Sequence, residues 1–137
     1  MIVADTGAIL ALIDADDQYH HEFVTLFEEE PGSWVLPWAI LPEVDYLLLT
    51  HVGANAERAF VKDLADGAYA VEWGDAADLV RARKLCERYR ALRLGLVDAV
   101  VVAMAERLRA DAIATVDLRH LAAIAIEGTP RLLPRDR

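Results

Sequence analysis

The chain begins with Met1-Ile2-Val3-Ala4-Asp5-Thr6-Gly7, and the apolar-rich stretch Ala8-Ile9-Leu10-Ala11-Leu12-Ile13 follows. The first four residues are apolar but too few for a helix, and they stop at an acidic turn that contains glycine. This pattern predicts a buried strand, an abrupt turn and the start of a helix. In an open parallel sheet, ligands bind at the carboxyl ends of the strands, which is where Asp5 lies in this prediction. Asp5 is therefore either a ligand-binding carboxylate or only the cap of the helix, and its position alone favours neither.

Apolar runs of strand length recur along the chain and alternate with segments of helical periodicity. We expect further strands at residues 34–36, 68–72 and 112–116, and a last edge strand at 124–126. The segment 96–105 is apolar nearly all round, which predicts a buried central helix. The alternation predicts an α/β protein, a three-layer α/β/α fold with a central parallel sheet. We expect one domain over residues 1–137, with residues 128–137 as an exposed tail.

Composition narrows the classes of protein. The formal net charge is −9, which argues against a simple nucleic-acid-binding module but suits an enzyme that binds divalent cations, or a basic protein partner. The single cysteine, Cys86, cannot form an internal disulfide, and neither a signal peptide nor a membrane-spanning segment is expected. We therefore expect a cytoplasmic protein without a membrane partner. The spacing of the four histidines does not predict a structural zinc site.

Four acidic residues occupy comparable places in the predicted fold. Asp5 and Asp117 directly follow strands, whereas Glu43 and Asp98 lie near the beginnings of helices. We expect the four carboxylates to converge at the carboxyl edge of the parallel sheet. Asp98 carries the most weight, because it interrupts the most apolar stretch of the chain, where a carboxylate without partners is strongly disfavoured. Helix capping is the alternative for Asp98, and metal ligation is the interpretation that we favour.

Carboxylates that converge at one edge repel each other. Two unit charges about 4 Å apart cost about 4 kcal/mol at an effective dielectric constant near 20, so the acids must either protonate or bind cations. Oxygen ligands without histidine or thiolate select Mg²⁺ or Mn²⁺, and such a site supports phosphodiester hydrolysis in which a metal activates water. Asp5 and Asp98 are the expected principal metal ligands, with Glu43 and Asp117 completing the site directly or through water. Thr115 shares a strand face with Asp117 and could hold an acid or a water molecule, although alone it is better explained as an ordinary strand residue.

The sequence resembles PIN-domain ribonucleases over nearly its whole length, in particular the VapC-type toxins of bacterial toxin–antitoxin pairs. Four ordered motifs carry the resemblance, and none is specific alone: Val3-Ala4-Asp5-Thr6-Gly7-Ala8, Leu41-Pro42-Glu43-Val44, Leu96-Val97-Asp98-Ala99 and Ala114-Thr115-Val116-Asp117. The sequence departs from the commonest pattern at Gly7, where serine is frequent, and at Val116, where a charged residue is common. Neither departure removes a carboxylate.

The resemblance implies a Mg²⁺-dependent endoribonuclease that cleaves single-stranded RNA, with Mn²⁺ able to substitute. It implies catalytic roles for the four acids, with Thr6 and Thr115 in support, a VapB-like antitoxin as partner, and a homodimer. Because the acidic chain repels RNA, we expect basic residues to recruit it locally; they are Arg81, Arg83, Lys84, Arg88, Arg93 and Arg119, of which Arg93 and Arg119 are the candidate RNA contacts. The alternatives are a non-catalytic PIN-like interaction module, or a PIN-like nuclease that acts on other RNA or on DNA.

Overall fold

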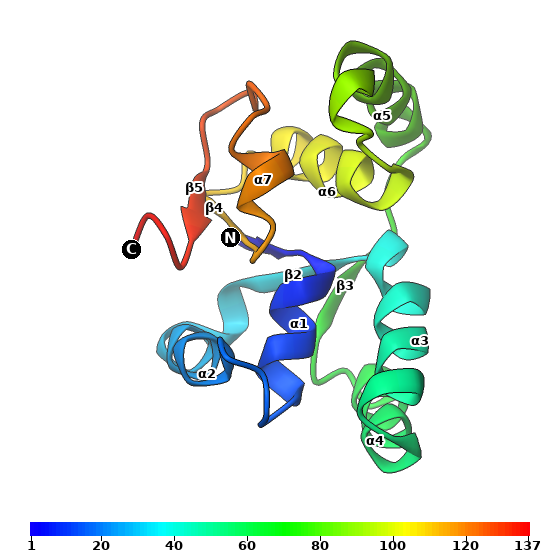
Figure 1. Cartoon of the computed structure of the whole chain (residues 1–137), viewed down its shortest axis with the longest axis vertical. Coiled ribbons are helices and arrows are strands. Elements are labelled where there is room, and N and C mark those ends of the chain that lie inside the picture. Colours follow the sequence, from blue (N-terminus) through cyan, green and yellow to red (C-terminus); the bar gives the residue numbers. More distant parts are fainter.

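The computed structural model describes residues 1–137 and has a central sheet of five strands with helices on both of its faces (Figure 1). In the order of the sheet, the strands are β3 (Ala70–Glu72), β2 (Trp34–Pro37), β1 (Ile2–Ala4), β4 (Ala112–Ala114) and β5 (Arg131–Leu133). Every neighbouring pair is parallel. The predicted three-layer α/β/α architecture with a parallel sheet is confirmed.

Strand β1 lies at the centre of the sheet. Val3 is paired with Val35 of β2 on one side and with Ile113 of β4 on the other. All three residues of β1 are buried, because a central parallel strand is covered on both faces by helices. The continuous apolar run at the start of the chain is therefore what this position requires. It also fixes Asp5, the next residue, at the carboxyl edge in the middle of the sheet.

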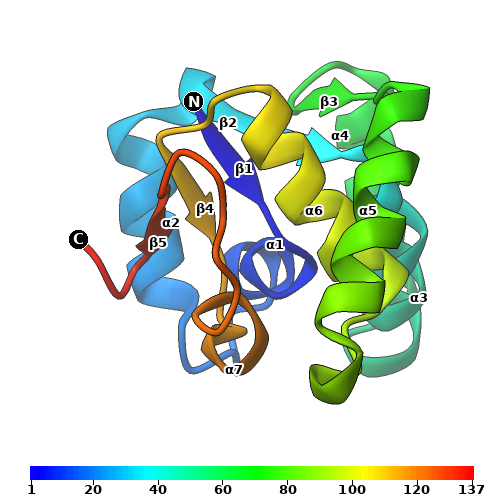
Figure 2. The same cartoon turned by 90° about the horizontal axis from the view of Figure 1, so that it is seen from above.

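The helices form two layers. On one side lie α1 (Thr6–Ile13), α2 (His20–Glu29), α3 (Leu41–His51) and α4 (Ala54–Ala65), and on the other α5 (Ala76–Arg88) and α6 (Leu96–Arg107) (Figures 1 and 2). Helix α6 packs on β1 and β2 and buries seven consecutive residues, 99–105, as its apolar sequence predicts. Helix α7 (Leu118–Leu121) is a single turn after β4, and short 3₁₀ turns are η1 (Pro31–Ser33), η2 (Trp38–Ile40) and η3 (Arg90–Leu92). None of the helices has the length and apolar character needed to cross a membrane.

Two ion pairs fasten α6 to its surroundings. Arg107 Nε donates to Asp78 Oδ1 of α5 at 2.7 Å, and the Arg81 guanidinium donates twice to Glu106, at 2.7 and 3.1 Å. The acidic partners are almost fully buried, so removal of either arginine would leave an uncompensated charge. Arg81 is thus bound to α6 and is not a free cation for RNA, contrary to the expectation from sequence.

Two expectations near the C-terminus are wrong. Residues 124–126 form no strand; Ile124 and Ile126 are buried side chains of the segment between α7 and β5. Residues 128–137 are not a wholly exposed tail, because Leu132 and Leu133 are each 3% exposed and β5 pairs with β4. The apolar alternation at 124–126 reflects burial without backbone pairing. The strand at 131–133 is too short to be recognised locally and depends on the edge that β4 offers.

Candidate active site

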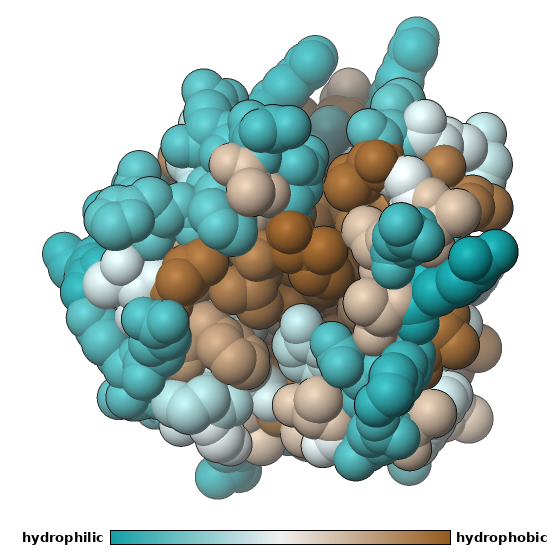
Figure 3. Space-filling model, turned by 90° about the horizontal axis from the view of Figure 1, so that it is seen from below, coloured by the Kyte–Doolittle hydropathy of each residue, from teal (hydrophilic) through white to brown (hydrophobic).

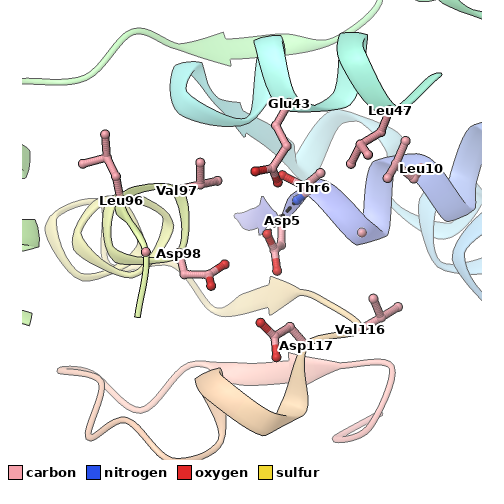
Figure 4. A pocket seen from close by; sticks show the side chains of 12 residues that line it. Asp5, Thr6, Leu10, Glu43, Leu47, Leu96, Val97, Asp98, Val116 and Asp117 are labelled. Atoms are coloured by element: carbon pink, nitrogen blue, oxygen red, sulfur yellow. Dashed lines mark hydrogen bonds between the residues drawn. The ribbon is translucent and has the colours of Figure 1, made fainter. Parts of the chain in front are cut away.

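A cavity of about 530 Å³ lies at the carboxyl edge of the sheet, and all four predicted acids line it. Asp5 follows β1 and Asp117 follows β4, while Glu43 and Asp98 belong to the first turns of α3 and α6. Their carboxylates point toward a common space in Figure 4. The other lining residues are Thr6, Gly7, Leu10, Leu47, Gly95, Leu96, Val97 and Val116.

Asp5 is the most buried of the four acids, at 4% exposed. Its Oδ1 accepts a hydrogen bond from the Thr6 backbone N–H at 2.6 Å, and its Oδ2 accepts one from the Thr115 hydroxyl at 2.8 Å. Burial, followed by the negative charge of Asp98, raises the pKa of Asp5 from 3.8 to about 6 in spite of these hydrogen bonds. Asp5 is the N-cap of α1 and also lines the cavity, so capping is confirmed and does not exclude ligand binding, which stays a prediction.

Thr115 connects two of the acidic segments. Its side chain is completely buried, and its hydroxyl donates to Asp5 while accepting from the backbone N–H of Asp117 at 2.9 Å. These two hydrogen bonds give Thr115 a polar role that an ordinary β-branched strand residue would not have. Thr115 therefore fixes the carboxylate of Asp5 relative to the chain segment that carries Asp117.

Asp98 is the third residue of α6, whose N-cap is Gly95, so the capping alternative for Asp98 does not apply. Its side chain is about a quarter exposed and faces the cavity. The pKa of Asp98 is raised, chiefly by burial and then by the charge of Asp117, while His120 partly offsets the shift. Burial and neighbouring carboxylates thus disfavour the charged forms of both Asp5 and Asp98.

His120 is a member of the acidic cluster that sequence reasoning missed. Its Nδ1 lies 2.8 Å from Oδ2 of Asp117 and 4.0 Å from Oδ2 of Asp98. The hydrogen bond with Asp117 is the largest cause of the raised pKa of His120. Ligand atoms of Asp98, Asp117 and His120 all lie within 4.8 Å of one another, whereas no such group includes Asp5 or Glu43. The signal was the three-residue spacing from Asp117, which one helical turn brings together.

The remaining candidates lie at the rim. Glu43 is exposed on the first turn of α3, and its charge adds to the raised pKa of Asp98. Arg93 is exposed and adopts a left-handed backbone conformation (φ 54°) two residues before Gly95. Arg119 is exposed on α7, two residues after Asp117. The two arginines therefore belong to segments that border the cavity, and neither is buried in an internal ion pair.

The residues around the cavity fit a divalent cation of the hard type. Four carboxylates supply the oxygen ligands that Mg²⁺ and Mn²⁺ prefer. Thr6 also lines the cavity, and its hydroxyl is buried without a hydrogen-bond partner in the protein. A buried polar group normally has such a partner, so this hydroxyl is an unsatisfied polar group beside the cavity.

The protein has a parallel α/β sheet with an acidic cavity at its carboxyl edge, and comparison with known proteins gives its family. Residues 2–127 match the PIN domain, and the chain belongs to the PIN domain family. It is 33% identical to Ribonuclease VapC26 of Mycobacterium tuberculosis over 130 residues, which cover 95% of this chain and 96% of that protein. The family that the motifs predicted is thereby confirmed.

Solved structures show the same fold at lower identity. The crystal structure of the Mycobacterium tuberculosis toxin VapC20, which cleaves the sarcin–ricin loop, has a TM-score of 0.75 at 23% identity and covers 82% of this chain and 87% of that one. DNA-bound VapBC of Salmonella typhimurium has a TM-score of 0.70 at 16% identity, covering 96% and 95%. FitAcB of Neisseria gonorrhoeae has a TM-score of 0.65 at 14% identity, covering 96% of each chain.

The two departures from the family pattern touch each other. A Cβ atom built on Gly7 would lie 2.5 Å from Cγ2 of Val116, which is closer than real Cβ atoms come. Both residues line the cavity, as do Leu10 and Leu47. Gly7 is therefore required by Val116, and the pair replaces polar groups with an apolar wall at this end of the cavity.

The stability of the metal-free protein should depend on the protonation of Asp5. Its folded pKa of about 6 exceeds the ordinary value of 3.8, so the folded state binds the proton more tightly. Protonation of Asp5 therefore stabilises the folded state by at most about 3 kcal/mol. This contribution is fully present below about pH 4 and is lost as the pH rises through about 6. In urea unfolding from pH 4 to 7, the free energy of unfolding of Asp5→Asn should increase relative to that of the natural protein as the pH rises. A difference between the two proteins that is independent of pH would contradict this.

A double-mutant cycle tests the contact between Gly7 and Val116. Gly7→Ala should destabilise by about 1–3 kcal/mol through overpacking. Val116→Ala removes the atom that the added methyl group would contact. The double variant should therefore lose less stability than the sum of the losses of the two single variants, with a coupling free energy of about 0.5 kcal/mol or more. Urea unfolding measures all four proteins. Strict additivity would mean that Val116 moves aside without cost.

Proposed function

We propose that this protein is a Mg²⁺-dependent endoribonuclease that cleaves single-stranded RNA and acts as the toxin of a toxin–antitoxin pair. The observation that carries the proposal is that four carboxylates, one of them buried with a raised pKa, line a single cavity at the carboxyl edge of the sheet. The names of two relatives support it, because VapC26 is a ribonuclease and VapC20 is a toxin that cleaves the sarcin–ricin loop.

In this proposal Asp5 and Asp98 bind the cation, and Glu43 and Asp117 complete the site directly or through water. A bound divalent cation supplies Lewis-acid chemistry and lowers the pKa of water for phosphodiester hydrolysis. Thr115 holds the Asp5 carboxylate in place through its 2.8 Å hydrogen bond. The carboxylate of Asp5 is thus positioned before substrate arrives, as electrostatic catalysis requires.

RNA must reach a site whose own charge repels it. The net charge of −9 opposes the phosphate backbone at long range, but salt screens this repulsion beyond about 8 Å at physiological ionic strength. Arg93 and Arg119 are exposed on the segments that border the cavity and are the cations we assign to the phosphates next to the cleaved bond. Leu96, exposed at the rim, offers an apolar surface to an unpaired base. Such contacts suit a single strand better than a rigid duplex.

Asp98→Asn tests the nuclease assignment, because it keeps the shape of the side chain and removes one charge. Cleavage of an unstructured RNA with Mg²⁺ should fall by about 100-fold or more, and the rise in melting temperature that Mg²⁺ produces should disappear. Asp16→Asn, a matched change at an exposed acid outside the cavity, should behave like the natural protein. Circular dichroism checks the fold.

Sequencing of the new RNA ends identifies the substrate, and a DNA strand of the same sequence serves as the comparison. Full Mg²⁺-dependent cleavage by folded Asp98→Asn would overturn the assignment of the site. The absence of any cleavage by the natural protein would favour the interaction module, and preferential cleavage of the DNA strand would favour a deoxyribonuclease.

The proposed partner is a VapB-like antitoxin. Two of the similar structures are the complexes FitAcB and VapBC, and the acidic charge of this chain attracts a basic peptide and speeds its association. Seen from the side of α1, α2 and α4, hydrophobic surface gathers in a central hollow with hydrophilic residues around it (Figure 3). An amphipathic helix of the partner fits such a surface, while one of its arginines pairs with the carboxylates of the cavity. We also propose that the toxin is a homodimer, which sedimentation would test.

The arginine contact predicts a specific competition. Replacement of the partner's arginines by alanine, one at a time, should identify one whose loss weakens binding and restores RNA cleavage, because it alone occupies the carboxylate cavity. Affinity should also fall as salt is raised. A neighbouring gene product that neither binds nor inhibits, or inhibition that is unchanged in every arginine variant, would contradict the proposal.

A further inference from the structure

The imidazole of His120 lies where a metal ligand would be expected to lie. Asp117 is the N-cap of α7 and accepts from the backbone N–H of His120, and the side chain of His120 lies against the carboxylates of Asp117 and Asp98. Nδ1 then lies 2.8 Å from one carboxylate oxygen of Asp117 and 4.0 Å from one of Asp98. The side chain is about three-quarters buried, so solvent does not freely compete for this nitrogen.

The spacing of these atoms suits a common cation. Two ligand atoms at right angles on one ion, with bonds of about 2.1 Å, lie about 3 Å apart, and opposite ligand atoms lie about 4 Å apart. The separations of 2.8 and 4.0 Å are close to these two values. His120, Asp98 and Asp117 form the tightest set of candidate ligand atoms in the chain, tighter than any set built from carboxylates alone.

The connector between α5 and α6 passes close to the ring of His120, because the backbone of Leu92 contributes to the raised pKa of this histidine. A histidine that binds a metal through one nitrogen typically donates its other N–H to a backbone carbonyl or a carboxylate, which fixes the tautomer and the ring plane. Leu92 is the candidate for this second partner when Nδ1 binds a cation.

We propose that His120 is a nitrogen ligand of the cation bound at this site, together with Asp98 and Asp117. This inference rests on the proposed function only in requiring that a divalent cation binds the carboxylate cavity. Imidazole binds Mn²⁺ and later transition metals better than Mg²⁺, whose preference is for oxygen. The site should therefore favour Mn²⁺ over Mg²⁺, and removal of the imidazole should reduce that preference.

The direct test is pulsed electron paramagnetic resonance on the natural protein loaded with Mn²⁺. A coordinated imidazole gives a nitrogen modulation of the Mn²⁺ echo, and the natural protein should show it. His120→Gln should lose it, whereas the matched control His51→Gln, at an exposed histidine on α3, should keep it. Competition binding should show the Mn²⁺-over-Mg²⁺ affinity ratio falling about tenfold in His120→Gln but not in His51→Gln.

A reciprocal variant keeps the test sharp if His120→Gln does not fold. The chain has four histidines, so replacement of His20, His21 and His51 by glutamine leaves His120 as the sole histidine, and the modulation should persist. Bound Mn²⁺ without nitrogen modulation in the natural protein, or modulation that survives in His120→Gln, would overturn the proposal. If Mg²⁺-dependent RNA cleavage is intact in that case, the nuclease function stands without a histidine ligand. If no Mn²⁺ binds at all, both proposals fail.

Discussion

The backbone holds the carboxylates of Asp5, Asp98 and Asp117 close together, and their mutual repulsion is the main physical constraint on this structure. Parallel pairing of β1 with β4 places Asp5 and Asp117 at the same edge, and the packing of α6 on β1 and β2 adds Asp98. The central position of β1 leaves Asp5 almost no solvent. Two hydrogen bonds stabilise its charge, yet its pKa remains about 6, so they do not offset the cost of burial and of neighbouring charge.

The rest of the structure keeps this arrangement rigid. Seven consecutive buried residues hold α6 against the sheet, and buried ion pairs of Asp78 and Glu106 with arginines join it to α5. Such pairs are weak sources of net stability, but they penalise any rotation of α6 that would part them. Because Asp98 belongs to the first turn of this helix, the same contacts fix its direction. The repulsion among the carboxylates is thus opposed by contacts elsewhere, namely the packing of α6 on the sheet, its ion pairs with α5 and the hydrogen bond of Thr115 to Asp5.

The sequence predicted those features that depend on local pattern and on the general geometry of parallel sheets. The apolar run before Asp5 identified a buried strand, and the acids after strands or at helix starts were expected at one edge, where the structure has them. Prediction did not reach features that arise from tertiary contact. β5 has only a short apolar pair and forms because β4 presents an unpaired edge.

Contacts between side chains were the other limit. Gly7 and Val116 each differed from the family pattern, but their sequence positions gave no sign that a side chain on one would collide with the other. His120 was set aside because the histidines lacked zinc-ligand spacing, a criterion that considers histidines and cysteines only among themselves. Its relevant neighbours are carboxylates, one a turn earlier at the start of α7 and one on α6. Spacing from the acids, rather than between histidines, was the informative quantity.

Proton release on Mg²⁺ binding measures most directly whether a cation relieves this repulsion. Calorimetric titration at pH 6, in buffers of different ionisation enthalpy, should show about half a proton or more released per Mg²⁺, because Asp5 with a pKa of about 6 is half protonated there. The part of the release that comes from Asp5 should approach zero at pH 8 and should be missing at both pH values in Asp5→Asn. Mg²⁺ binding at pH 6 without proton release, or no binding at either pH, would contradict the central role assigned to the buried carboxylate.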